Sequence, residues 1–347
     1  MSNPYADLPD HAFWRRSVAG RPAQAVDPVV AAPFAISPDD AVATAGSCFA
    51  QHISRALVRR GYNYLVTETG EGEGYGVFPA RFGNIYAPRQ LLQTFDRAYG
   101  LFEPRERAWR RPDGAWVDPF RPQVEPAGFA TMEALEADRA AHLAAVRTMF
   151  ETCAVFIFTL GLTEAWRSRK DGSVYPICPG VQAGAFDAKR HEFVNYGFND
   201  VIDDMRAAIA MMREINPALR LILTVSPVPL TATASGNHVL PATTYSKSTL
   251  RAVAGDMADA HEFVWYFPSY EIIVSPTFRG MFYLPNPREV SIKGVEFVMT
   301  HVFAGLNATP AAPGTRPAPA PKPSPAAPPQ DDSDVTCEEA MLEAFGR

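Results

Sequence analysis

The sequence predicts an α/β fold in which a mostly parallel β-sheet is covered by helices on both sides. Short, continuous apolar runs of strand length alternate with longer segments that carry apolar residues at helical spacing. Strands that lack polar alternation are buried on both faces, which is typical of parallel sheets enclosed by helices. Ligands of such sheets bind at the carboxyl ends of the strands, so the residues that follow each strand are the candidates for a functional site.

The predicted elements follow in chain order. A strand at 41–45 leads through Gly46 into a helix that begins at Phe49 and ends at Gly61, a residue suited to a helix C-terminus. The stretch 75–128 is rich in aromatic residues and proline, and we expect it to form an inserted cap or long loops. The remaining strands are predicted at 153–160, 219–225 and 263–267, and the remaining helices at 134–149, 201–215, 246–261 and 290–303.

Composition excludes several classes of protein. The chain has 347 residues, of which 47% are hydrophobic and 20% charged, enough for a sizeable core. Its net charge is -6, and residues 331–347 hold six acids and one base, so the rest of the chain carries only -1. We therefore expect no nucleic-acid partner. With no 18-residue apolar run and no signal-peptide pattern, we expect a cytoplasmic protein without membrane insertion. Its four cysteines lack CxxC spacing, and no metal site is expected.

The C-terminal part differs in composition from the body. Nine prolines lie between Pro310 and Pro329, which predicts a disordered Pro/Ala-rich linker at 308–330 after a domain at 1–307. The acidic tail, 331–347, carries a capping-box spacing and three apolar residues that would share one face of a short helix. The tail is either a solubilising end or a peptide that binds a protein partner through Met341, Leu342 and Phe345.

The turn after the first strand carries two side chains of nucleophilic type, Ser47 and Cys48. A helix N-terminus offers unpaired N–H groups and the positive end of the helix dipole, which lower a thiol pKa and stabilise an oxyanion. Cys48 is therefore the favoured nucleophile, with His52 on the same helical face. The alternative is that Ser47 caps the helix and Cys48 is a small buried residue.

The run from Gly46 to Ala50 reads Gly-Ser-Cys-Phe-Ala, and it resembles the signature of the GSCFA domain family. Further blocks resemble the family in the same order over roughly residues 3–305, and they lie at 159–166, 224–230, 238–240, 245–247 and 266–271. The family is grouped with the SGNH (GDSL-like) hydrolases. The resemblance implies a flavodoxin-like, SGNH-type three-layer fold and acyl-ester chemistry.

The resemblance also implies roles for individual residues. Cys48 falls at the SGNH nucleophile and Ser47 where an Asp would stand, although a slip of one residue would select Ser47. The second SGNH block resembles the surroundings of Gly83, whose N–H and the neighbouring Asn84 amide would bind the oxyanion. The third block resembles 161–164, which places Thr163 and Glu164 at the oxyanion or substrate. A literal Gly-Phe-Asn-Asp occurs at 197–200, but we expect it to cap the helix that follows.

The general base is the uncertain element of this assignment. Where SGNH proteins carry Asp-x-x-His, this chain has Asn286-Pro287-Arg288-Glu289. Glu289 could act as base if buried, or it could form a surface ion pair. His238 is the better proton carrier on chemical grounds, and its alternative role is to stabilise a loop. Tyr245, Ser246 and Lys247 could form a catalytic group, or Ser246 could cap a helix.

Together these features predict acyl or acetyl transfer, or ester hydrolysis, on a hydroxylated small molecule or a glycan, as in polysaccharide modification. No cofactor is required beyond an acyl donor such as acetyl-CoA. The competing hypothesis is a catalytically degenerate binding or assembly protein that keeps the SGNH fold and recruits a partner through its tail. The absence of Asp-x-x-His favours this alternative, and the intact nucleophile turn favours an enzyme.

Overall fold

A computed structural model describes residues 3–71, 74–307 and 338–345. The chain divides into two compact units. One comprises the described residues of Met1–Ala35 and Phe267–Gln330, and the other comprises those of Ile36–Tyr266 and Asp331–Arg347. The sequence predicts a linker at 308–330, and this segment lies outside the described residues.

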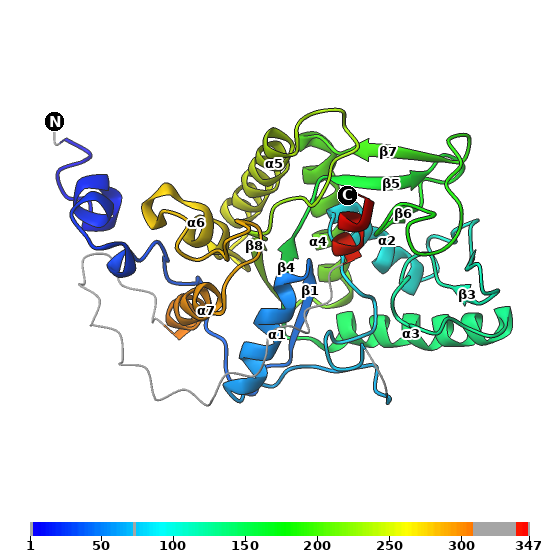
Figure 1. The fold of residues 1–347 in the computed structure, drawn as a ribbon. Helices are drawn as coiled ribbons and strands as arrows, with labels where there is room; N and C mark the ends of the chain where they lie inside the picture. The colour runs from blue at the N-terminus through cyan, green and yellow to red at the C-terminus, as the bar shows by residue number, and fades with distance from the viewer. Residues whose placement is uncertain (1–2, 72–73, 308–337, 346–347) are drawn as a thin grey trace. The chain divides into compact units, whose positions relative to one another are not determined.

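The second unit is built on a four-stranded parallel sheet with the strand order β1-β4-β8-β9 (Figure 1). The central strand β4 (Val155–Leu160) pairs with β1 (Val42–Gly46) on one side and β8 (Arg220–Val225) on the other. Every residue of β1 and β4 is buried. Helices flank the sheet, and α1 (Phe49–Arg59) packs on β1 while α5 (Val239–Ala260) packs on β8 and β9 (Val264–Tyr266). The predicted α/β class is confirmed.

The other elements have the following bounds. The helices are α2 (Pro88–Ala98), α3 (Met132–Thr152), α4 (Phe198–Ile215), α6 (Ser269–Val274) and α7 (Ile292–Asn307), and the strands are β2 (Trp109–Arg110), β3 (Trp116–Val117), β5 (Glu164–Ser168), β6 (Val174–Tyr175) and β7 (His191–Asn195). Short 3₁₀ helices lie at η1 (Asp10–Ala12), η3 (Ala23–Ala25), η4 (Pro276–Phe278) and η6 (Glu338–Phe345), and a short π-helix lies at η2 (Arg15–Ala19). The four strands and five helices predicted from the pattern all occur, with ends shifted by a few residues and α5 starting seven residues early.

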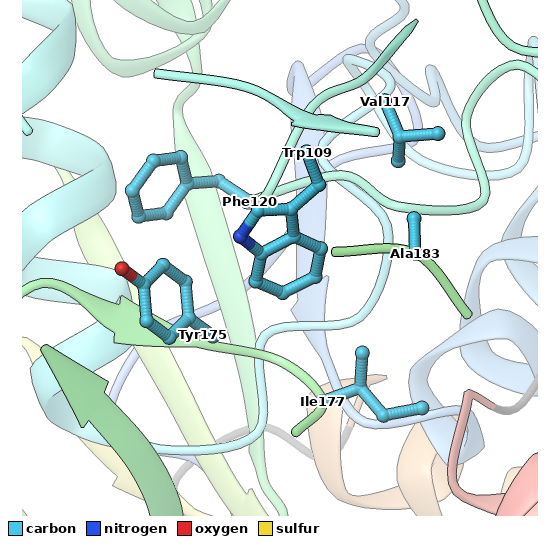
Figure 2. Packing of buried hydrophobic residues seen from close by; sticks show 6 residues of the cluster. All are labelled: Trp109, Val117, Phe120, Tyr175, Ile177 and Ala183. Atoms are coloured by element: carbon cyan, nitrogen blue, oxygen red, sulfur yellow. The ribbon is translucent and has the colours of Figure 1, made fainter. Parts of the chain in front are cut away.

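The sequence pattern does not reveal a second, antiparallel sheet of the order β6-β5-β7, or the short hairpin β2-β3. The hairpin β2-β3 lies within the stretch 75–128, and Trp109 and Val117 from it form an apolar cluster with Phe120, Tyr175, Ile177 and Ala183 (Figure 2). The indole ring of Trp109 lies 5.2 Å from the ring of Tyr175, and Phe120 lies 5.6 Å from the same ring. The insertion is thus a structured cap with a small core.

The helix η6 of the tail adds to this cluster. Met341 packs against it, and Gln123 Nε2 lies 3.0 Å from the Met341 sulfur. Phe345 is 68% exposed, so Met341 and Phe345 do not share one buried face. Thr336, which with Glu339 gives the tail its capping-box spacing, lies outside the described residues.

The first unit joins the two ends of the body. The backbone N–H of Ala32 donates to the carbonyl of Gly305 at the end of α7. Its interior is aromatic, with Phe282 and Phe297 stacked at 4.8 Å and Phe278 packed against both. Among the described residues, no helix is long and apolar enough to cross a membrane.

Candidate functional site

The turn from β1 to α1 depends on Gly46. Its φ of +136° is one that residues with a Cβ rarely adopt, and an added Cβ would lie 2.3 Å from the carbonyl oxygen of Thr159. The N–H of Ser47 donates to that same oxygen at 3.1 Å. Because Gly46 has no side chain, the turn can pack directly against the carboxyl end of β4.

Ser47 and Cys48 occupy different environments in this turn. Ser47 is 3% exposed and lies close to Gly161. A Cβ added to Gly161 would lie 3.1 Å from the Cβ of Ser47. Its Oγ is buried without a hydrogen-bond partner in the described structure. Cys48 is 7% exposed and is the N-cap residue of α1, and its side chain makes no capping bond. The predicted cap role of Ser47 is thus not observed, and Cys48 stands where the helix dipole acts on it.

Three chain segments meet at the carboxyl ends of β1 and β4. The N–H of Ile85 donates to the carbonyl of Gly46 at 2.8 Å. One residue further on, the carbonyl of Tyr86 accepts from Gly161 at 2.8 Å and from Leu162 at 3.0 Å. The loops that the sequence assigned to the second and third SGNH blocks are therefore both attached to the nucleophile turn.

Two buried glutamines that the sequence motifs do not predict, Gln51 and Gln90, hold the loop of Gly83 and Asn84. Gln51 Nε2 donates to Asn84 Oδ1 at 3.2 Å, which turns the amide nitrogen of Asn84 away from Gln51. Gln90 donates to the Asn84 carbonyl and accepts from the Tyr86 N–H, each at 2.9 Å. Gly83 itself has a φ of +71°. Gln51, a polar residue on the buried face of the predicted helix, is the sequence feature that could have indicated this contact.

Thr163 has both of its proton donors engaged within the protein. Its N–H donates to Ser246 Oγ at 3.0 Å, and its hydroxyl donates to Asn195 Oδ1 at 2.7 Å. The predicted use of this hydroxyl as an oxyanion donor is therefore not supported by the geometry. Ser246 and Lys247 of α5 act on this loop from inside the protein, and Ser246 does not cap a helix.

Glu164 is 9% exposed and accepts a hydrogen bond from Thr233 Oγ1 at 2.7 Å. Burial raises its pKa, and the bond from Thr233 opposes this effect only in part. Thr233 also contacts Ser235 Oγ at 2.7 Å, and the N–H of Asn237 donates to that oxygen. Glu164 thus anchors the loop that ends at His238.

His238 is exposed and forms the N-cap of α5, where its Nδ1 accepts from the N–H of Leu240 at 3.1 Å. This bond matches the alternative, loop-stabilising interpretation of the residue. It also places the proton of the neutral ring on Nε2. The neighbouring Val239 packs against a buried cluster that includes Tyr86 and Leu162, so the N-terminus of α5 lies near the third-block loop. The ring of His52 is 5.6 Å from that of Phe49, edge to face.

Glu289 is a candidate base only if its carboxylate is buried, and the structure does not bury it. It is exposed, and its N–H donates to Asn286 Oδ1 within a surface turn of the first unit. Its carboxylate is therefore not the buried base that the sequence hypothesis requires. The segment at 197–200 behaves as expected, because Asp200 Oδ2 accepts from the Gly197 N–H at 2.9 Å and caps α4.

The fold and the turn together define an α/β protein with serine and cysteine side by side where the first strand of a parallel sheet meets its helix. The chain belongs to the GSCFA family, whose model matches residues 41–302. No curated protein matches the sequence.

Two solved structures resemble the chain distantly. One is a protein of Streptococcus pneumonia described as a candidate platelet activating factor, with a TM-score of 0.28 and 13% identity over 50% of this chain and 66% of that chain. The other is a carbohydrate esterase family 3 protein from Talaromyces cellulolyticus, with a TM-score of 0.26 and 13% identity over 62% of this chain and 87% of that chain. At these values neither transfers an activity to this chain.

Proposed function

We propose that this protein is an acyl-ester enzyme that hydrolyses an ester or transfers an acyl group, using Cys48 as its nucleophile. The observation that carries the proposal is the position of Cys48 at the N-cap of α1, directly after a turn that only glycine fits at residue 46. Attached to this turn are two loops with buried polar groups. A thiol at a helix N-terminus favours its thiolate, which is the reactive form.

In the proposed reaction the Cys48 sulfur forms a bond to the acyl carbonyl carbon, whose oxygen takes the negative charge. The N–H of Gly83 and the amide of Asn84 would bind this oxygen, since Gln51 and Gln90 fix that loop. When the ester C–O bond breaks, the leaving alcohol receives a proton. Water, or a hydroxyl of a second substrate, then attacks the thioester and returns the thiol.

His238 and Glu164 are the two proposed proton carriers. His238 has the chemistry, but protonation of its Nδ1 would cost the cap of α5. Glu164 is buried and its raised pKa suits proton exchange nearer neutrality. The hydroxylated substrate is proposed to be a small molecule or a glycan, with acetyl-CoA as one possible acyl donor.

The test is hydrolysis of p-nitrophenyl acetate, with and without acetylated xylan or acetyl-CoA plus xylan as the natural-type substrates. We expect Cys48→Ala to abolish turnover and Cys178→Ala, at a half-buried thiol away from this turn, to retain it. After rapid quenching, mass spectrometry of the wild-type protein should show one added acetyl group. Peptide mapping should place this group on the peptide that contains Cys48. If Ser47→Ala loses activity while Cys48→Ala retains it, the nucleophile is Ser47 and not Cys48.

The remaining variants assign the proton carrier. Loss of kcat in His238→Gln with retention in Glu164→Gln identifies the imidazole, and the reverse identifies the carboxylate. If the wild-type protein neither turns over any of these substrates nor becomes acetylated, the enzyme proposal fails. The degenerate binding or assembly protein is then the better description.

A further inference from the structure

A second group of polar residues, separate from the Cys48 turn in its residues, is buried in the cap of the second unit. Asp118 and Arg121 are fully or almost fully buried, and their side chains pair at 3.1 Å. Arg121 also pairs with Asp138 at 2.7 Å, and Arg139 pairs with Asp118 at 3.2 Å. Arg81 completes the network by pairing with Asp138 and, at 3.0 Å, with Glu68.

Arg97, from the end of α2, is the exception in this group. It is 8% exposed and makes no side-chain ion pair or hydrogen bond with a described residue. Its guanidinium stacks on the ring of Phe120 at 4.0 Å, and Phe120 is held in turn by the cluster in Figure 2. The buried Nη2 of Arg97 therefore lacks an acceptor, which is costly for a charged donor.

The unpaired donors line a small cavity. Its walls include Arg97, Arg121, Phe120, His142 and Gln90, and its volume is about 10 Å³. Arg121 Nη1 is likewise a buried donor without a partner among the described residues, and Arg121 belongs to the same wall. A space of this size holds one atom-sized occupant and excludes phosphate, sulfate and carboxylates.

The charges around the cavity do not balance. The four arginines at 81, 97, 121 and 139 face the three carboxylates at 68, 118 and 138. His142 contacts Glu68 at 2.7 Å, and burial together with the charge of Arg121 lowers the pKa of His142 to about 4. The imidazole is therefore neutral at pH 7, and this largely buried network carries one excess positive charge.

We propose that this cavity binds a single chloride ion between Arg97 and Arg121. One halide would supply an acceptor to both Arg97 Nη2 and Arg121 Nη1 and would neutralise the excess charge. A water molecule would satisfy donors but would leave the charge. The ion also touches the region of Gln90, whose amide holds the loop of Asn84 and Tyr86. Chloride would thereby brace this loop whether or not the loop takes part in catalysis.

The first measurement is thermal unfolding of the full chain at constant ionic strength, with sodium chloride replaced stepwise by sodium gluconate. We expect Tm to rise with the logarithm of the chloride concentration in the manner of a single site, by about 2 °C at ten times the Kd. Arg97→Met should remove the chloride dependence. The matched control is Arg213→Met, since Arg213 also stacks on an aromatic ring, at 4.2 Å from Phe263, but donates to the Leu219 carbonyl.

The second measurement does not depend on a variant that folds. Crystals of the wild-type protein grown in sodium bromide should show an anomalous peak between Arg97 and Arg121. An ordinary water density without anomalous signal would overturn the proposal, as would equal Tm values in chloride and gluconate. A bromide peak without any chloride-dependent rise in Tm would also overturn it, because occupancy would then require crystal concentrations.

Discussion

The Nζ of Lys247 lies 2.7 Å from the carbonyl oxygen of Gly161, and Lys247 is 1% exposed. An ammonium group at this depth is held by the oxygens around it, and here it fixes the end of β4 from within α5. Ser246 contacts the same loop at Thr163. Ser246 and Lys247 therefore support the candidate site from within α5, whereas Tyr245 is 47% exposed.

Replacing Lys247 with Met should lower the free energy of unfolding by about 1–3 kcal/mol, because the Gly161 carbonyl loses a buried donor. Urea denaturation measures the change. Lys170→Met is the control, since Lys170 is exposed and its replacement should stay within about 0.5 kcal/mol. Equal effects of the two substitutions would contradict the support role.

Gly46→Ala should destabilise the protein by about 2–5 kcal/mol, because the new Cβ meets the Thr159 carbonyl and adopts a disfavoured φ. Gly172→Ala separates these two causes. Gly172 also has a positive φ, +75°, but a Cβ there would meet nothing within 4 Å, so its cost should be about 1–2 kcal/mol. Chemical denaturation of both variants gives the comparison, and a cost at Gly46 no greater than that at Gly172 would refute the steric argument.

His142 should make stability depend on pH. Burial and the charge of Arg121 lower its native pKa to about 4, whereas an unfolded histidine titrates near 6.5. Between these values the unfolded chain binds one more proton, so stability falls by up to about 1.4 kcal/mol per unit as pH drops from 6.5 to 4.

The measurement is urea denaturation across this pH range. His142→Gln should flatten the slope, whereas His11→Gln, at an exposed residue, should keep it. Below this window Glu68 adds a second loss. Burial alone would raise its pKa, but bonds from His142 and Arg81 lower it to about 2, so its contribution disappears as pH falls from 4.5.

Iodoacetamide should modify Cys48 before Cys153 near neutral pH. Burial raises the pKa of Cys153 to about 12 and leaves it 1% exposed, so almost none of it is thiolate. Cys178, with its pKa raised to about 11, serves as a half-buried internal reference. Peptide mapping over time gives the order, and modification of Cys153 ahead of Cys48 in the folded protein would argue against Cys48 as nucleophile.

Met341→Ala should lower the free energy of unfolding by about 1 kcal/mol, since Met341 packs on the cluster of Trp109 and Tyr175. Phe345→Ala should change it by less than about 0.5 kcal/mol, because Phe345 is 68% exposed. Trp fluorescence during denaturation reports both. If neither substitution alters stability while Met341→Ala abolishes capture of a protein partner, the tail is a docking peptide and its internal contact is incidental.

The sequence predicted the parallel sheet well because its strands are continuous apolar runs, and the turn at Gly46 because glycine there precedes a clear helical pattern. The antiparallel sheet escaped prediction since β5 mixes Glu164, Trp166 and Arg167 and resembles a surface segment. Contacts between residues far apart in the sequence, such as Gln51 with Asn84, carry no local signal. The sequence likewise does not show that the ion pair of Asp118 and Arg121 is buried, because two charged residues at this spacing are usually exposed.

The hydrogen bond between Ala32 and Gly305 has a consequence for biosynthesis. A ribosome delivers Ala32 early, but its partner emerges only after the whole parallel sheet has been made. The unit of residues 36–266 can therefore fold first, while the N-terminal segment waits for α7. In a nascent chain stalled before α7, residues 3–35 would lack the partner that Gly305 provides, and we expect proteases to cleave them although the sheet is complete.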